Sequence, residues 1–299
     1  MNEPVESIDG LVRLRLDFAY DGTDFSGWAK QPGLRTVQGE LLDALAAIFN
    51  QAPESFALVV AGRTDKGVHA ANQVAHLDLT EQQVERHLQK LRLRLNSLLP
   101  DDIRIYGVAV APEGFDARFA AIYRRYVYRI ADAASIQSPL HARNTLFVRK
   151  KLDLNLMQAA ALGLYGLHDF ASFCRPRPGS TTIRELREVT LKRRPIDQFD
   201  LSADGVIEVE LLADAFCHNM VRSIVGALIA VGEHRATSLD LAELLARADR
   251  TTSYKVVDPR GLTLLEIGYP APELMATQVA NAQALRTQED IDAAAEADD

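Results

Sequence analysis

The first regular pattern in the sequence is an alternation of apolar and charged residues from Leu11 to Tyr20. Every second residue there is apolar or aromatic, which predicts a strand with one buried face. Residues 36–50 space apolar side chains four apart, which predicts a helix. Strands over 72–79 and 103–110, with a helix over 84–98 that Pro100 stops, complete a β-α-β-α-β order.

A similar order recurs further along the chain. We expect strands over 123–130, 185–192, 206–211 and 262–269, and helices over 154–165, 216–231 and 238–247. The pattern indicates two α/β halves, each a mostly antiparallel sheet with helices on one face. We therefore divide the chain into a disordered lead-in (1–10), an N-terminal half (11–112), a C-terminal half (113–273) and an acidic, disordered tail (274–299).

Composition places the chain among ordinary globular proteins. It has 299 residues, 47% of them hydrophobic and 25% charged. The two cysteines, Cys174 and Cys217, lack metal-ligand spacing, which argues against a disulfide framework and fits a reducing cytosol. The acidic N-terminus is unlike a signal peptide, and no apolar run approaches the ~20 residues of a membrane span. We therefore expect a cytoplasmic protein.

The net charge of −8 argues at first against a nucleic-acid partner. Residues 271–299 hold seven acids and one base, however, so the rest of the chain carries only −2. Local clusters of arginine and lysine must then decide the partner. Together, the basic clusters could form a positive groove for a phosphate backbone.

The segment Ala61–Ala70 (AGRTDKGVHA) concentrates residues that can carry chemistry. Two glycines bracket Arg63, Asp65 and Lys66, which suggests a tight loop with its backbone close to a ligand. A solvated turn with an Arg–Asp pair is the alternative. The sequence lacks the full phosphate-binding G-x-x-x-x-G-K-[ST] pattern, and no second acid suggests a glycosidase pair.

Arginines and tyrosines alternate between Phe115 and Ile130. On a strand, Tyr126 and Tyr128 share one face and Arg125 and Arg129 the other. Guanidinium groups bind phosphate and aromatic rings stack on bases, so the pattern suits RNA. An ordinary strand with tyrosines inside and arginines outside fits equally.

Arg222 stands in the otherwise apolar segment Phe216–Gly226. A buried arginine needs an anionic partner, and Asp65 is a candidate. The alternative is that Arg222 extends its side chain to the surface.

These segments, in this order, resemble the tRNA pseudouridine synthase A family. GRTDKGVHA resembles its catalytic loop, FDARFAAIYRRYVY its arginine–tyrosine strand, FCHNMVRSIVG its M-V-R helix and GLTL its closing strand. The N-terminal YDGT and TVQGE runs also match, so the resemblance spans roughly residues 11–270. The stretch from Val256 to Arg260 departs from the family's small-residue run, and the acidic tail has no counterpart.

The resemblance implies the pseudouridine synthase fold: two ferredoxin-like halves with joined, mainly antiparallel sheets and a central cleft. It also implies a homodimer that modifies uridines 38, 39 and 40 of the tRNA anticodon arm without a metal or organic cofactor. Asp65 would be the nucleophile, attacking C1′ or C6 or removing the C2′ proton. Arg222 would pair with it, and Tyr126 would stack on the flipped uracil. The other expected substrate contacts are Arg63, Lys66, Arg125 and Leu262.

Two other classes of function remain open from the residues alone. An RNA-binding protein without catalysis would keep the basic groove and the tyrosines, but it gains nothing from a carboxylate at its centre. An Asp-dependent hydrolase of small glycosides or phosphoesters would need a metal or a second acid near Asp65, and the sequence shows neither.

Overall fold

The computed structural model describes residues 10–175, 181–197, 204–249, 254–282 and 286–297. The chain forms two compact units, one of Met1–Ile122 with Leu264–Gln283 and one of Tyr123–Thr263 with Ala284–Asp299. Nearly all strand pairs within each unit are antiparallel, and helices pack on the sheets. The expected mixed α/β, mainly antiparallel class is confirmed. The division between the units falls after Ile122, about ten residues beyond the boundary that the sequence suggested.

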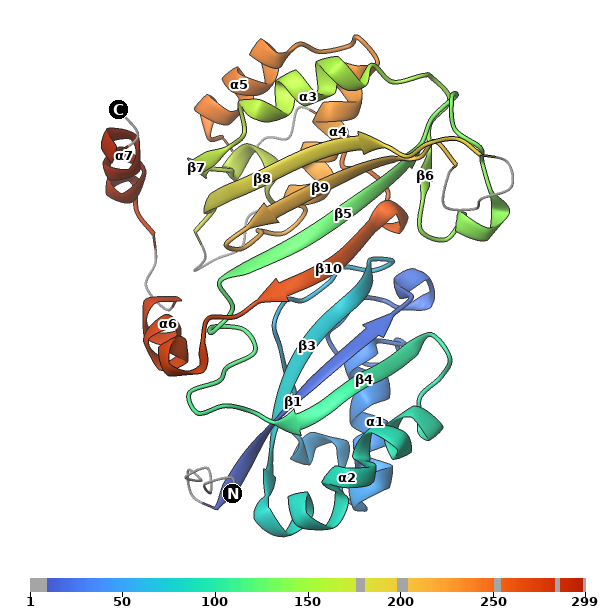
Figure 1. The fold of residues 1–299 in the computed structure, drawn as a ribbon, viewed down its shortest axis with the longest axis vertical. Helices are drawn as coiled ribbons and strands as arrows, with labels where there is room; N and C mark the ends of the chain where they lie inside the picture. The colour runs from blue at the N-terminus through green and yellow to red at the C-terminus, as the bar shows by residue number, and fades with distance from the viewer. Residues whose placement is uncertain (1–9, 176–180, 198–203, 250–253, 283–285, 298–299) are drawn as a thin grey trace. The chain divides into compact units, whose positions relative to one another are not determined.

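The sheet of the first unit has the strand order β4-β1-β3-β10, with the short β2 paired to β3. Helices α1 and α2 lie together against this sheet (Figure 1). The strands are β1 (Leu11–Tyr20), β2 (Val59–Val60), β3 (His69–Thr80), β4 (Ile103–Val110) and β10 (Leu262–Gly268), and the helices are α1 (Val37–Phe49), α2 (Glu81–Leu98) and α6 (Met275–Ala282).

Local sequence accounts for most of these elements. The apolar face of β1 is buried as its alternation predicts, with Leu14, Leu16 and Phe18 completely enclosed. Thr36 caps α1 by accepting a hydrogen bond from the Gly39 amide. Both predictions are thereby confirmed.

The sheet of the second unit has the order β5-β9-β8-β7, and β6 pairs in parallel with β5. Helices α3, α4 and α5 gather beside these strands (Figure 1). The strands are β5 (Tyr123–Ala131), β6 (Leu146–Phe147), β7 (Gly166–Asp169), β8 (Ile183–Arg193) and β9 (Ile207–Ala213), and the helices are α3 (Leu154–Leu162), α4 (Met220–Gly232), α5 (Ser238–Arg247) and α7 (Gln288–Ala297).

Several elements differ from the sequence prediction: β3 and α2 each begin three residues earlier than expected, and α3 ends three residues earlier. The expected start of the long apolar helix at Phe216 is wrong, because α4 begins four residues later, after Asn219 with its φ of +70°. The tail expected to be disordered carries α6 and α7; Met275 of α6 is buried, which accounts for the order there. In the described part of the chain, no helix is long and apolar enough to cross a membrane.

Candidate active site

The loop that carries Asp65 joins β2 to β3 in the first unit. The Asp65 carbonyl accepts a hydrogen bond from the Val68 amide at 3.2 Å, which closes a tight turn over Lys66 and Gly67. Gly67 has a φ of +77°, in the left-handed region that favours glycine. The predicted tight loop is therefore confirmed, and its second glycine has a conformational reason.

Asp65 lies half-buried on this loop, and the side chains of Arg63 and Lys66 are exposed beside it in the sequence. The segment that follows β1 holds the backbone of this loop through two hydrogen bonds. Trp28 donates its amide to the Thr64 carbonyl at 3.0 Å, and the Gly67 amide donates to the Phe25 carbonyl at 3.4 Å. The backbone on both sides of Asp65 is thus held by a segment about forty residues earlier in the chain.

Strand β5 places its tyrosines and arginines on opposite faces, as its alternation predicts. Tyr126 and Tyr128 are buried, and the ring of Tyr126 meets the edge of the Phe216 ring with centroids 5.2 Å apart. Arg125 and Arg129 lie on the other face, where Arg125 contacts Glu188 at 2.8 Å. Tyr128 therefore belongs to the core, whereas Tyr126 keeps 8% of its surface exposed.

The guanidinium of Arg125 is held between carboxylates on neighbouring strands. Besides Glu188, Glu210 lies 3.7 Å away, and Arg129 pairs similarly with Glu208 at 3.1 Å. The glutamates reduce the positive charge that this face offers to a phosphate. These ion pairs could not be predicted from the sequence of β5, because the glutamates lie on β8 and β9.

Arg222 lies in the first turn of α4 and is half-buried. Its Nε donates to the Val257 carbonyl at 2.7 Å, and its Nη1 lies 3.4 Å from the Asn219 side-chain oxygen. The backbone at Lys255 can pack this closely on α4 because residue 226 is a glycine. A Cβ on Gly226 would lie 2.1 Å from the Lys255 carbonyl oxygen. The segment that precedes β10 thus orients the Arg222 side chain.

The stretch from Val256 to Arg260, which departs from the family pattern, is hydrogen-bonded to a side chain of β5. The Tyr128 hydroxyl donates to the Asp258 carbonyl at 2.6 Å, and burial raises the pKa of Tyr128. Asp258 also pairs with Arg260 at 3.1 Å. Leu262, which follows, is 6% exposed, so it is an apolar side chain in a packed position.

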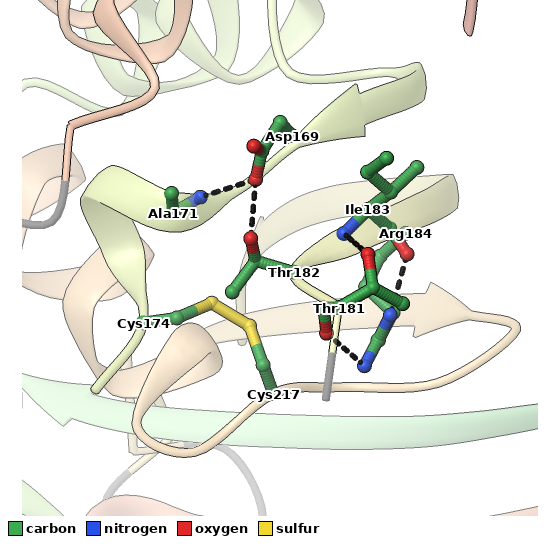
Figure 2. Close-up of a disulfide and its surroundings, with 8 residues drawn as sticks. All are labelled: Asp169, Ala171, Cys174, Thr181, Thr182, Ile183, Arg184 and Cys217. Atoms are coloured by element: carbon green, nitrogen blue, oxygen red, sulfur yellow. Dashed lines mark hydrogen bonds between the residues drawn. A yellow bond between two sulfur atoms is a disulfide. The ribbon is translucent and has the colours of Figure 1, made fainter. Parts of the chain in front are cut away.

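The two cysteines form a disulfide in the second unit (Figure 2). The sequence argued against a disulfide framework, and that expectation is corrected here. Cys174 and Cys217 are 43 residues apart in the chain, but their Cα atoms lie 5.8 Å apart, a separation that a disulfide spans. The adjoining Arg175 amide donates to the His218 carbonyl at 2.9 Å, so the backbone also joins these two segments.

The structure gathers the candidate residues into two groups. Asp65, Arg63 and Lys66 share one loop of the first unit, while the second unit holds Arg125, Tyr126, Arg222 and Leu262, the first residue of β10, whose residues from Leu264 onward belong to the first unit. Among the described residues, no group of three or more His, Cys, Asp or Glu could hold a metal ion. The first group offers a carboxylate flanked by cations, and the second an aromatic ring and an oriented guanidinium.

Comparisons with known proteins extend over both units. A family model described as tRNA pseudouridine synthase matches residues 160–270. The tRNA pseudouridine synthase A of Streptomyces avermitilis is 49% identical over 280 residues, which cover 93% of this chain and 95% of that protein. The proteins of the same name from Frankia casuarinae (51% identical, 90% of this chain and 93% of that protein) and Corynebacterium glutamicum (44%, 96% and 100%) are also similar.

Proposed function

Because the chain belongs to the tRNA pseudouridine synthase A family, and is therefore an isomerase, we propose that it converts uridines 38, 39 and 40 of the tRNA anticodon stem-loop to pseudouridine. The proposal includes Asp65 as the nucleophile and a reaction without a metal or organic cofactor. The observation that carries it is the half-buried Asp65, on a loop fixed through the backbone and flanked by Arg63 and Lys66.

The reaction breaks the N1–C1′ bond, forms a C5–C1′ bond, releases the C5 proton and leaves a proton on N1. A positioned carboxylate suits the covalent route, since it can hold one fragment while the base turns. Asp65 attacks C1′ of the ribose or C6 of the uracil, or it removes the C2′ proton. All three routes need the carboxylate ionised.

The remaining roles follow from the chemistry of each side chain. We assign Arg222 as the cation that pairs with Asp65, supported by its orientation through the Val257 carbonyl. The ring of Tyr126 stacks on the flipped uracil, and its hydroxyl is available for proton transfer. The family resemblance supports both assignments.

The other proposed contacts bind the rest of the substrate. Arg63 and Lys66 are exposed cations suited to phosphate, and Leu262 supplies an apolar wall. Arg125 is the weaker phosphate contact, because Glu188 lies 2.8 Å from its guanidinium.

The same resemblance supports a homodimer in which one tRNA contacts both subunits, acting in the cytoplasm. Size-exclusion chromatography with light scattering tests the assembly: a dimeric mass agrees with the proposal, and a monomer that is fully active contradicts it.

Substitution of Asp65 tests the central claim. With tRNA tritiated at uridine C5, the wild type should release tritium, and Asp65→Asn should release none while binding tRNA nearly as well. Asp43→Asn is the matched control, an exposed aspartate on α1 of the same unit, and it should behave as wild type.

The outcomes separate the alternatives. An Asp65→Asn variant that still releases tritium refutes the catalytic assignment. A wild-type protein that binds tRNA without releasing tritium is an RNA-binding protein without this activity. Hydrolysis of free nucleosides by the wild type would favour the hydrolase class instead.

A further inference from the structure

Three polar side chains lie buried behind the Asp65 loop. Tyr20, at the end of β1, is 4% exposed, Thr64 of the loop is 7% exposed and Gln73 of β3 is fully enclosed. The Tyr20 hydroxyl lies 2.8 Å from the Thr64 hydroxyl, and the Gln73 Nε2 lies 3.2 Å from the Tyr20 hydroxyl. Burying a polar group costs folding free energy unless the group is hydrogen-bonded, and these three side chains meet that need by bonding to one another.

The group binds the loop at two points. Besides Tyr20, the Gln73 amide donates to the Gly62 carbonyl at 2.9 Å, and the Gln73 side-chain oxygen accepts from the Val74 amide at 3.2 Å. Each side-chain atom of the Gln73 amide therefore has a partner. The held residues, Gly62 and Thr64, stand on either side of Arg63, directly before Asp65.

An irregularity in the sheet accompanies this arrangement. Phe18 pairs with Gln73, but Tyr20 pairs with Ala70, so β3 carries one extra residue between the two pairs. Such a bulge turns side chains away from the regular alternation and is frequent beside active sites. Burial raises the pKa of Tyr20 to about 12, so its hydroxyl stays protonated well above neutral pH.

We infer that Tyr20 and Gln73 are positioning residues of the isomerase: through Thr64 and Gly62 they fix the backbone from which Asp65 acts. The inference rests on the proposed role of Asp65. Neither residue needs to touch the substrate. In the sequence, Gln73 is a polar residue within the otherwise mainly apolar stretch of β3.

Removal of the Tyr20 hydroxyl should affect turnover more than binding. Tyr20→Phe keeps the ring but leaves the Thr64 hydroxyl and one Gln73 N–H without their partner. A shift of about 1 Å in a catalytic group can cost about 100-fold in rate. We expect kcat to fall about 10- to 100-fold, with KM for tRNA within about twofold of wild type.

A matched variant separates positioning from general loss of stability. Tyr165 in the second unit has a hydroxyl that also bridges two groups, donating to the Val189 carbonyl at 2.8 Å and accepting from the Val189 amide at 3.0 Å. Tyr165→Phe should lower the melting temperature without lowering kcat of the folded protein. If both variants lose activity only in proportion to their unfolded fraction, the inference is wrong.

A double-mutant cycle tests the path through Thr64. Thr64→Val should reduce kcat, Thr64→Ser should preserve it because the hydroxyl remains, and Tyr20→Phe with Thr64→Val should cost little more than the larger single loss. Fully additive losses, or a Tyr20→Phe variant with the wild-type kcat, overturn the inference. If Asp65→Asn is inactive in that case, the proposed function stands and only the positioning role fails.

Discussion

The buried carboxylate of Asp132 offers a quantitative test of what stabilises the second unit. Its side chain is completely enclosed just after β5. Arg193 donates to both carboxylate oxygens at 2.8 and 2.7 Å, and the amides of Leu152 and Ala134 donate at 2.9 and 3.0 Å. Burial alone would raise the pKa of Asp132, but these donors outweigh it and lower the pKa to about 2.

The shift from an ordinary value of 3.8 is worth about 2 kcal/mol of unfolding free energy, at about 1.4 kcal/mol per pKa unit. Because the folded-state pKa lies below the unfolded one, this stability is present above about pH 4 and is lost as the pH falls towards 2. Asp132→Asn removes the charge at every pH and leaves Arg193 unbalanced. We expect a loss of about 2–4 kcal/mol at pH 7 and a weaker dependence on pH between 4 and 2.

Urea unfolding followed by far-ultraviolet circular dichroism measures this loss. Fluorescence of Trp28, the only tryptophan, reports the first unit separately. The control is Asp101→Asn, since Asp101 is exposed and its contact with Arg104 is long, at 3.8 Å; it should cost less than about 1 kcal/mol. An Asp132→Asn variant as stable as this control, or one that keeps the wild-type acid sensitivity, would refute the reasoning.

Two further predictions concern the disulfide and the tail. Reduction of Cys174–Cys217, which closes a loop over a separation of 43 residues, should lower the unfolding free energy of the second unit by up to about 4 kcal/mol, while Cys174→Ser should unfold identically with and without reductant. Truncation before Met275, which is buried, should cost about 2 kcal/mol in a urea titration. Truncation before Arg286, which removes its ion pair with Asp214 and the contacts of α7 with β7, should cost less, about 1 kcal/mol.

Some elements with a local cause have the bounds predicted from the sequence, whereas α2 begins three residues before the expected 84 although Thr80 caps it. β1 and β4 have the expected bounds, and α5 begins after the Thr237 capping box as its pattern indicates. The start of α4 could not be predicted, because the apolar pattern continues through Phe216 while the backbone turns at Asn219. Strands β2, β6 and β7, of two to four residues, are too short to show a period.

In the candidate site, too, features with a local cause could be predicted and long-range contacts could not. The tight turn at Asp65 followed from nearby residues, since its glycine and its i to i+3 hydrogen bond are local. The environment of each arginine was not predictable, because Arg125 meets Glu188 from another strand and Arg222 meets the carbonyl of Val257. A side chain's type can be read from the sequence, but its partner is decided by the fold.

The YDGTDFSGW segment and the Asp65 loop are far apart in the sequence but pack directly against each other, and two glycines allow this close contact. A Cβ on Gly22 would lie 1.9 Å from the Val68 carbonyl oxygen, so the backbone after β1 packs directly on the far side of the Asp65 turn. Gly27 has a φ of +97°, and a Cβ there would lie 3.1 Å from the Thr64 carbonyl oxygen. A larger residue at either position must push the loop that carries the carboxylate, so the YDGTDFSGW segment is constrained by the geometry of the loop as strictly as by its own fold.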